Sequence, residues 1–176
     1  MNWSDVLEIL KYILPSLVVM LTAYLILSNF LGSQKELKQL ELRVENYKTS
    51  LPVRLQAYER LTIFLERISP NNLLQRVNKA GMNARDLQLA LISNIRAEFE
   101  HNLAQQIYVS AGTWLMIVQV KEEIVSIVNR ISADMPETAT GKDLGRGVLE
   151  YFINNEQALP TQKALDTLKA EVRKVY

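Results

Sequence analysis

The feature that most constrains this chain is an uncharged, largely apolar run from Tyr12 to Gln34. As a helix it would be roughly 35 Å long, because each residue adds about 1.5 Å, and a bilayer's hydrocarbon core is about 30 Å thick. Between Tyr12 and Leu31 it holds eleven Leu, Ile, Val and Phe residues, which favour insertion by roughly 3 to 7 kcal/mol. We therefore predict a transmembrane helix at residues 12–31, within an N-terminal segment of residues 1–32.

A cleaved signal peptide is the alternative interpretation of this run. Signal peptides begin with a basic segment and have a shorter apolar stretch. Here Asp5 and Glu8 precede Lys11, and the run is too long. The sequence favours an uncleaved anchor.

The charges beside the run predict its orientation. Lys11 is the one basic residue before it, whereas Lys35, Lys38, Arg43 and Lys48 follow it closely. Basic residues flanking a transmembrane helix mark the cytoplasmic side. We expect a single-pass protein of the inner (cytoplasmic) membrane, with its N-terminus outside and its C-terminal domain in the cytoplasm.

The chain after the anchor is about the size of one domain. Its charge is uneven: residues 33–79 hold nine Lys/Arg and five Asp/Glu (+4), and residues 80–176 hold ten and twelve (−2). The basic part lies nearest the predicted bilayer, so Lys35, Lys38 and Arg43 are candidate contacts for lipid headgroups. The simpler interpretation is that these basic residues form a solvated surface and lie there because basic residues flank the cytoplasmic end of a transmembrane helix. The pattern does not predict nucleic-acid binding.

A heptad of apolar residues follows the anchor. Leu37, Leu40, Val44 and Tyr47 are spaced three and four apart, which is typical of a coiled-coil seam or of one core-facing stripe. Pro52 interrupts the pattern, and proline disfavours a helix interior. We predict a juxtamembrane stalk over residues 33–50 with a joint at residues 49–51. The four seam residues are candidate contacts with a protein partner or a second copy, although the stalk could also fold back on its own body.

The stretch LPVRLQAYERLTIFLERISPNNLLQRV, residues 51–77, together with the N-terminal run, resembles a family of small single-pass membrane proteins from Bacteroidota. The resemblance covers most of the chain. It implies a membrane anchor followed by a cytoplasmic helical domain. The family has no assigned activity, so the resemblance supplies no functional residues.

Residues 51–176 predict a cytoplasmic, all-helical domain, so the whole chain is all-α with a bundle of about five to six helices. Ser69, Asn83 and Ser110 are expected to cap helices, and Gly81 to end one. Apolar periodicity places helices at residues 52–68, 70–79, 84–107, 111–131, 143–155 and 161–175,.

The stretch from Trp114 to Val120 is apolar nearly all round, which predicts a helix in the middle of the bundle. Because the stretch also contains β-branched residues, a strand is the alternative for part of it. The neighbouring uncharged residues are too polar for a second transmembrane span. Residues 133–142 are expected to form the main loop.

No motif in the sequence predicts chemistry. Glu98 and His101 have the spacing of a di-iron motif, but such sites need two motifs and His101 is the chain's one histidine. The chain has no cysteine and one histidine, so a zinc site lacks its usual ligands and thiol catalysis lacks a nucleophile,. The glycines of residues 140–147 lack the spacing of a phosphate loop. Arg54, Arg60 and Arg67 are interleaved with glutamates, which favours a solvated, salt-bridged face.

The sequence therefore predicts a protein that is not an enzyme, has no cofactor and has no evident small-molecule substrate. We expect a membrane-anchored scaffold, adaptor or accessory subunit that acts through helix contacts with a protein partner or with itself. The alternative is a sensor of lipids or ligands at the membrane surface, using the basic juxtamembrane region.

Overall fold

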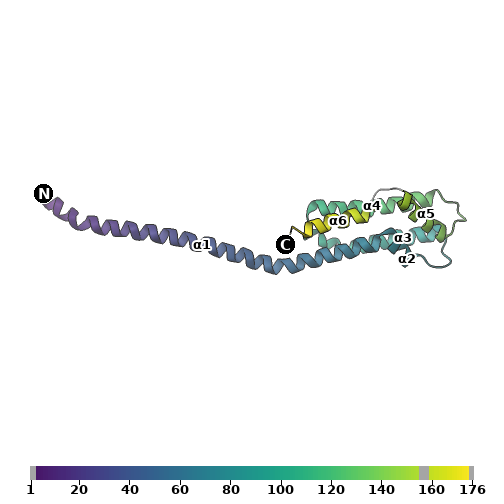
Figure 1. Ribbon diagram of the computed structural model, residues 1–176, viewed down its shortest axis with the longest axis horizontal. Coiled ribbons are helices and arrows are strands. Elements are labelled where there is room, and N and C mark those ends of the chain that lie inside the picture. The colour runs from purple at the N-terminus through teal and green to yellow at the C-terminus, as the bar shows by residue number, and fades with distance from the viewer. Residues whose placement is uncertain (1–2, 155–158, 175–176) are drawn as a thin grey trace. The chain divides into compact units, whose positions relative to one another are not determined.

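The computed structural model describes residues 3–154 and 159–174, with side chains described from residue 11 onward. Its elements are α1 (Trp3–Ile68), α2 (Pro70–Val77), α3 (Ala84–His101), the 3-10 helix η1 (Leu103–Ile107), α4 (Ala111–Ala133), α5 (Gly141–Asn154) and α6 (Pro160–Val172) (Figure 1). No strand occurs in these ranges, where an isolated bridge joins Asn83 and Thr140. The predicted all-α class is confirmed.

The chain divides into two compact units, Met1–Ser50 and Leu51–Tyr176. Helix α1 supplies the described part of the first unit and the first helix of the second. By length and composition it is long and apolar enough to cross a membrane. Its side chains from residue 11 to residue 50 are exposed.

The predicted joint at residues 49–51 is not a break in the helix, because α1 continues through Pro52. Proline lacks the N–H that would bond the carbonyl four residues earlier, so one backbone hydrogen bond is missing. Thr49 donates its hydroxyl to the Glu45 carbonyl at 3.0 Å, and Ser50 donates to the Tyr47 carbonyl at 3.3 Å. Neither acceptor is the carbonyl of Lys48, four residues before Pro52, so the helix continues with one backbone hydrogen bond missing,.

The second unit, which we call the body, is built from the end of α1 and the helices α2 to α6. The end of α1 runs antiparallel to α3, since Arg60 contacts Asn102 and Arg67 contacts Glu98. Helix α4 packs against both α3 and α6, and α6 lies beside it in Figure 1. Helices α2 and α5 pack on each other and on α3. The predicted helical bundle is confirmed.

The core of the body is apolar and draws on the end of α1 and on every α-helix from α2 to α6, but not on η1. The heptad series that begins in the stalk supplies Tyr58, Leu61, Leu65 and Ile68, which are all buried. Helix α3 contributes a buried stripe at spacings of four, as its periodicity predicts. The fully buried large side chains are Phe64, Leu61, Leu65, Ile68, Leu73, Leu87, Leu91, Ile95, Ile117, Ile124, Leu144 and Leu168.

Helix α3 ends earlier than its periodicity predicts. It stops at His101, and a 3-10 turn replaces the expected α-helix to residue 107. The Asn102 side chain donates to the Glu98 carbonyl at 2.8 Å, and such local side-chain bonds compete with the helix ladder. The expected core positions Leu103 and Ile107 are consequently exposed.

Two of the three predicted helix caps are confirmed. Asn83 accepts a hydrogen bond from the Asp86 N–H, and Ser110 from the Thr113 N–H. Ser69 does precede α2, but its hydroxyl donates back to the Glu66 carbonyl at 2.7 Å instead of capping. Helix α2 ends at Val77, two residues before the predicted end.

Helix α4 is less enclosed than its composition predicts. Ile117 and Val120 are buried, but Leu115 is exposed, so one side of the apolar stretch faces solvent. The stretch is helical throughout, which excludes the strand alternative there. For α6, whose predicted end is Val175, that last residue lies outside the described residues.

Helix α5 approaches the end of α4 closely at a glycine. A Cβ on Gly147 would lie 3.0 Å from Ile131 Cγ2 and 3.1 Å from Met135 Cε. At Gly145 the nearest atom would be a Leu74 methyl at 3.6 Å, an ordinary contact. The segment with glycines at residues 141–147 is thus a packed helix start.

Candidate functional site

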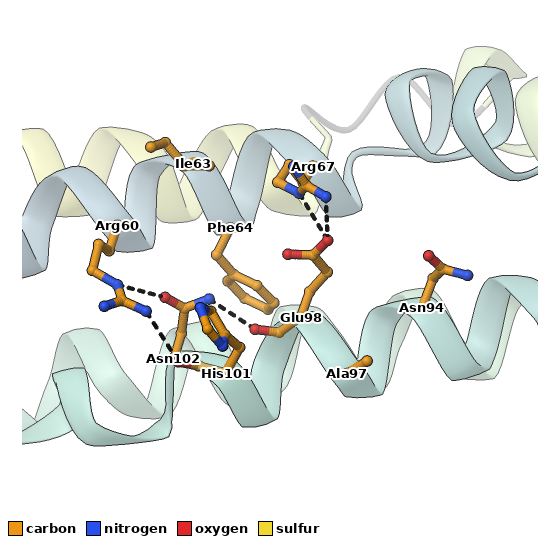
Figure 2. A pocket seen from close by; sticks show the side chains of 9 residues that line it. All are labelled: Arg60, Ile63, Phe64, Arg67, Asn94, Ala97, Glu98, His101 and Asn102. Carbon is orange, nitrogen blue, oxygen red and sulfur yellow. Dashed lines mark hydrogen bonds and ion pairs between the residues drawn. The ribbon is translucent and has the colours of Figure 1, made fainter.

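A groove of about 580 Å³ lies between the end of α1 and α3 (Figure 2). Both walls use positions on one helical face, spaced three and four apart. Its apolar lining residues are Ile63, Phe64 and Ala97, of which Phe64 is buried, and its other lining residues are polar. The lining residues are Arg60, Ile63, Phe64, Arg67, Asn94, Ala97, Glu98, His101 and Asn102.

Glu98 forms ion pairs with two arginines at one end of the groove. Its Oε1 accepts from Arg67 Nε at 2.8 Å and lies 2.8 Å from Arg76 Nη1. Partial burial alone would raise the pKa of Glu98, but the hydrogen bonds from Arg76 and Arg67 outweigh it and hold the pKa below its ordinary value. This cluster joins α1, α2 and α3.

Arg60 occupies the other end of the groove. Its Nε donates to Asn102 Oδ1 at 3.4 Å, and its Nη2 donates to the His101 carbonyl at 3.2 Å (Figure 2). Asn102 is itself buried and bonded to the Glu98 carbonyl. Arg60 therefore closes the C-terminus of α3, where a cation interacts favourably with the last carbonyls.

The polar contacts across the groove hold α1 and α3 together. Its arginines find their partners on α3, and not among the glutamates that interleave them in the sequence, as the sequence analysis expected. Three guanidinium groups against one carboxylate leave a positive surplus, but each guanidinium already donates to a protein acceptor. Glu98 and His101 lie here, and Glu98 serves as an ion-pair acceptor.

A second polar cluster, which we call the Glu171 junction, lies where α6 meets the start of α4. The Glu171 carboxylate accepts from the Ser110 N–H and hydroxyl, each at 2.7 Å, and from the Thr113 hydroxyl. The buried Tyr58 hydroxyl donates to the same carboxylate at 3.0 Å. One side chain thus ties α6 to α4 and α1.

The junction shifts the pKa of two of its groups. Burial alone would raise the pKa of Glu171, but hydrogen bonds from Thr113, Ser110 and Tyr58 outweigh it and lower the pKa. The pKa of Tyr58 is raised, first by burial and further by the neighbouring carboxylate. Sequence reasoning missed Glu171, since its partners lie up to 113 residues away.

The predicted contact residues lie on α1 in the first unit. The seam side chains Leu37, Leu40, Val44 and Tyr47 are between 46 and 58% exposed. The predicted headgroup contacts Lys35, Lys38 and Arg43 are exposed as well. At 100° per residue Lys35 and Lys38 point away from the seam, whereas Arg43 lies at its edge. A helix partner and a lipid surface could therefore use different faces of the stalk.

Residues 4–175 match a family of unknown function, DUF7935, and the chain therefore belongs to that family. No curated protein and no solved structure shows a significant match to the chain. The match agrees with the predicted resemblance to a family without assigned activity. The family description states no membrane attachment and no source organism, so these parts stay predictions.

Proposed function

We propose that this member of the DUF7935 family is a single-pass membrane protein whose cytoplasmic helical body acts as a scaffold, adaptor or accessory subunit without catalysis. The observation that carries the proposal is the exposure of the apolar side chains between Tyr12 and Leu31 of α1. Large exposed apolar surfaces in water mark interaction or membrane sites. A bilayer matches both the length and the all-round distribution of this surface.

The polar residues of the span support insertion. Ser16, Thr22 and Ser28 donate their hydroxyls to the helix's own carbonyls at 2.7, 2.8 and 3.0 Å. A hydroxyl that is bonded within its helix needs no water. The insertion energy of the apolar residues is therefore not offset by three unsatisfied hydroxyls.

The test of anchoring uses the full chain in membranes. We expect the chain to stay in the membrane during alkaline extraction. A reporter that is active only in the cytoplasm should be active when it is fused after Tyr176. As a matched control, the triple substitution Leu17→Arg, Leu21→Arg and Leu25→Arg should release the chain into the soluble fraction, since each central arginine opposes insertion by about 2.5–3.5 kcal/mol. Release of the unmodified chain by alkali would refute the anchor, and a reporter active on the outer side would refute the orientation.

The scaffold part of the proposal rests on the exposed seam. Leu37, Leu40 and Val44 share one face of the stalk at heptad spacing and are exposed within their unit. Helices with such a face bind other helices. A pull-down from gently solubilised membranes should return a stoichiometric protein partner or a second copy. Recovery of the chain alone, as a monomer, would refute the scaffold.

A second candidate is a sensor at the membrane surface, favoured by the exposure of Lys35, Lys38 and Arg43 beyond the apolar run. Each basic residue near an anionic leaflet contributes about 1 kcal/mol. Residues 33–176 should then bind vesicles containing phosphatidylserine more strongly than neutral vesicles. Charge reversal at the three positions should abolish that difference, and unchanged binding would refute this candidate.

A further inference from the structure

We propose that the stalk seam pairs in parallel with a helix of a different protein, and that its flanking charges oppose pairing with a second copy of this chain. The partner helix would be basic at the flanking positions nearer the membrane and acidic one heptad further on. The inference rests on the proposed anchoring, because two chains anchored alike in one membrane present their stalks parallel and in register.

The first step is that the heptad series is a packing face. Its later members Tyr58, Leu61 and Leu65 are at most 3% exposed inside the body. Its earlier members Leu37 and Leu40 are more than half exposed. One periodic stripe on one helix is thus buried in one unit and uncovered in the other.

The second step concerns the residues that flank the seam. With Leu37 and Val44 at the first heptad position and Leu40 at the fourth, Glu36 and Arg43 precede the seam on one side. Glu41 and Lys48 follow it on the other side. All four are exposed. These are the positions whose charges select partner and orientation in a coiled coil.

The third step compares the two kinds of partner. In a parallel, in-register pair, each preceding residue faces the following residue five positions later on the other helix. Two copies of this chain would oppose Glu36 with Glu41, and Arg43 with Lys48. Every flanking contact between copies is therefore between like charges, and like charges at such positions disfavour the pairing.

A complementary partner follows from the same geometry. It carries Lys or Arg opposite Glu36 and Glu41, and Asp or Glu opposite Arg43 and Lys48. The acidic pair of this stalk lies nearer the anchor and the basic pair further away. A charge-swapped copy of the chain has this complementary pattern and can serve as the probe.

The experiment exploits the absence of cysteine from the chain. Leu40→Cys places a single thiol on the seam, and oxidation in native membranes then reports pairing as a disulfide-linked dimer. The swapped chain carries Glu36→Lys, Glu41→Lys, Arg43→Glu and Lys48→Glu on the same background. Two different tags distinguish original–original, swapped–swapped and mixed dimers. The net charge of the stalk is unchanged by the swap.

We expect the mixed pair to cross-link about tenfold more than either matched pair, because four like-charge contacts become four opposite-charge contacts. A matched variant with only Glu41→Lys and Lys48→Glu should pair with itself, since it then faces Glu36 with Lys and Arg43 with Glu. Equal cross-linking of original and mixed pairs would overturn the charge rule. Absence of mixed dimers would overturn the seam as a parallel pairing face.

Alkaline extraction of the same membranes separates this inference from the proposed function. If the chains stay in the membrane and the cross-linking pattern fails, the pairing rule is wrong and the anchor stands. If alkali releases the original chain, the anchor is wrong, and the argument for parallel pairing is overturned with it.

Discussion

Replacement of Glu171 by glutamine should destabilise the body by about 2 kcal/mol at neutral pH. The carboxylate accepts four hydrogen bonds, two of them from the buried side chains of Tyr58 and Thr113. A glutamine amide has one acceptor oxygen and turns two N–H donors towards the remaining hydroxyls. The Ser110 and Thr113 hydroxyls must then accept from the amide, so two bonds to a charged group become neutral ones, at a cost of about 1 kcal/mol each.

This change is measurable by urea unfolding of the full chain in mild detergent. Trp114 stacks on Phe99 with ring centroids 5.4 Å apart, so its fluorescence reports the body, and Trp3→Phe removes the second tryptophan. A loss of 2 kcal/mol lowers the folded-to-unfolded ratio about 30-fold. Glu150→Gln on the exposed side of α5 is the control and should change stability little,.

The same variant predicts a change in pH dependence. The folded pKa of Glu171 is lowered, so its stabilisation is fully present above the unfolded value of about 4.3 and is lost as the pH falls through the folded pKa. Glutamine does not titrate, so the variant should lose less stability on acidification. Glu98 and Asp143, whose pKa values are also lowered, still contribute in both proteins. A change below about 0.5 kcal/mol at neutral pH, or an unaltered acid slope, would refute the junction.

Two further substitutions test the packing of the body. Gly145→Ala should stabilise the body by about 0.5 kcal/mol, since its Cβ meets only ordinary contacts. Gly147→Ala should be neutral or destabilising, because Ile131 must move. Equal urea midpoints for the two variants would contradict this prediction. Phe99→Ala should cost about 3 kcal/mol, since its ring contacts Trp114, and helical content followed by circular dichroism during unfolding should show the loss.

The sequence predicts those features of the body that depend on neighbours along the chain. The spacing of Leu87, Leu91 and Ile95 predicts the buried face of α3, and Asn83 and Ser110 predict helix starts. Each signal lies within one or two helical turns. Periodicity and capping are local physics, so a single sequence suffices for them.

The missed features depend on contacts between distant segments. The sequence pairs Arg67 with its neighbouring glutamates, but the folded chain brings Glu98 to it. The length of α3 is set by the Asn102 side chain, which competes with the helix ladder. Glu171 looks like one more exposed charge on the last helix. Only the closed bundle shows which donors surround it.

The position of Glu171 has a consequence for synthesis. Its carboxylate joins the start of α4 and Tyr58, which are made much earlier. At about 5–20 residues per second, roughly 120 residues separate the emergence of Leu51 from that of Glu171, an interval of roughly 6 to 24 s. Helix α4 is complete at Ala133, so its apolar face that packs on α6 is uncovered while the last roughly 38 of these residues are made, for about 2 to 8 s. A nascent chain of this kind would depend on chaperones during its own translation, and a pause before α6 would lengthen that dependence.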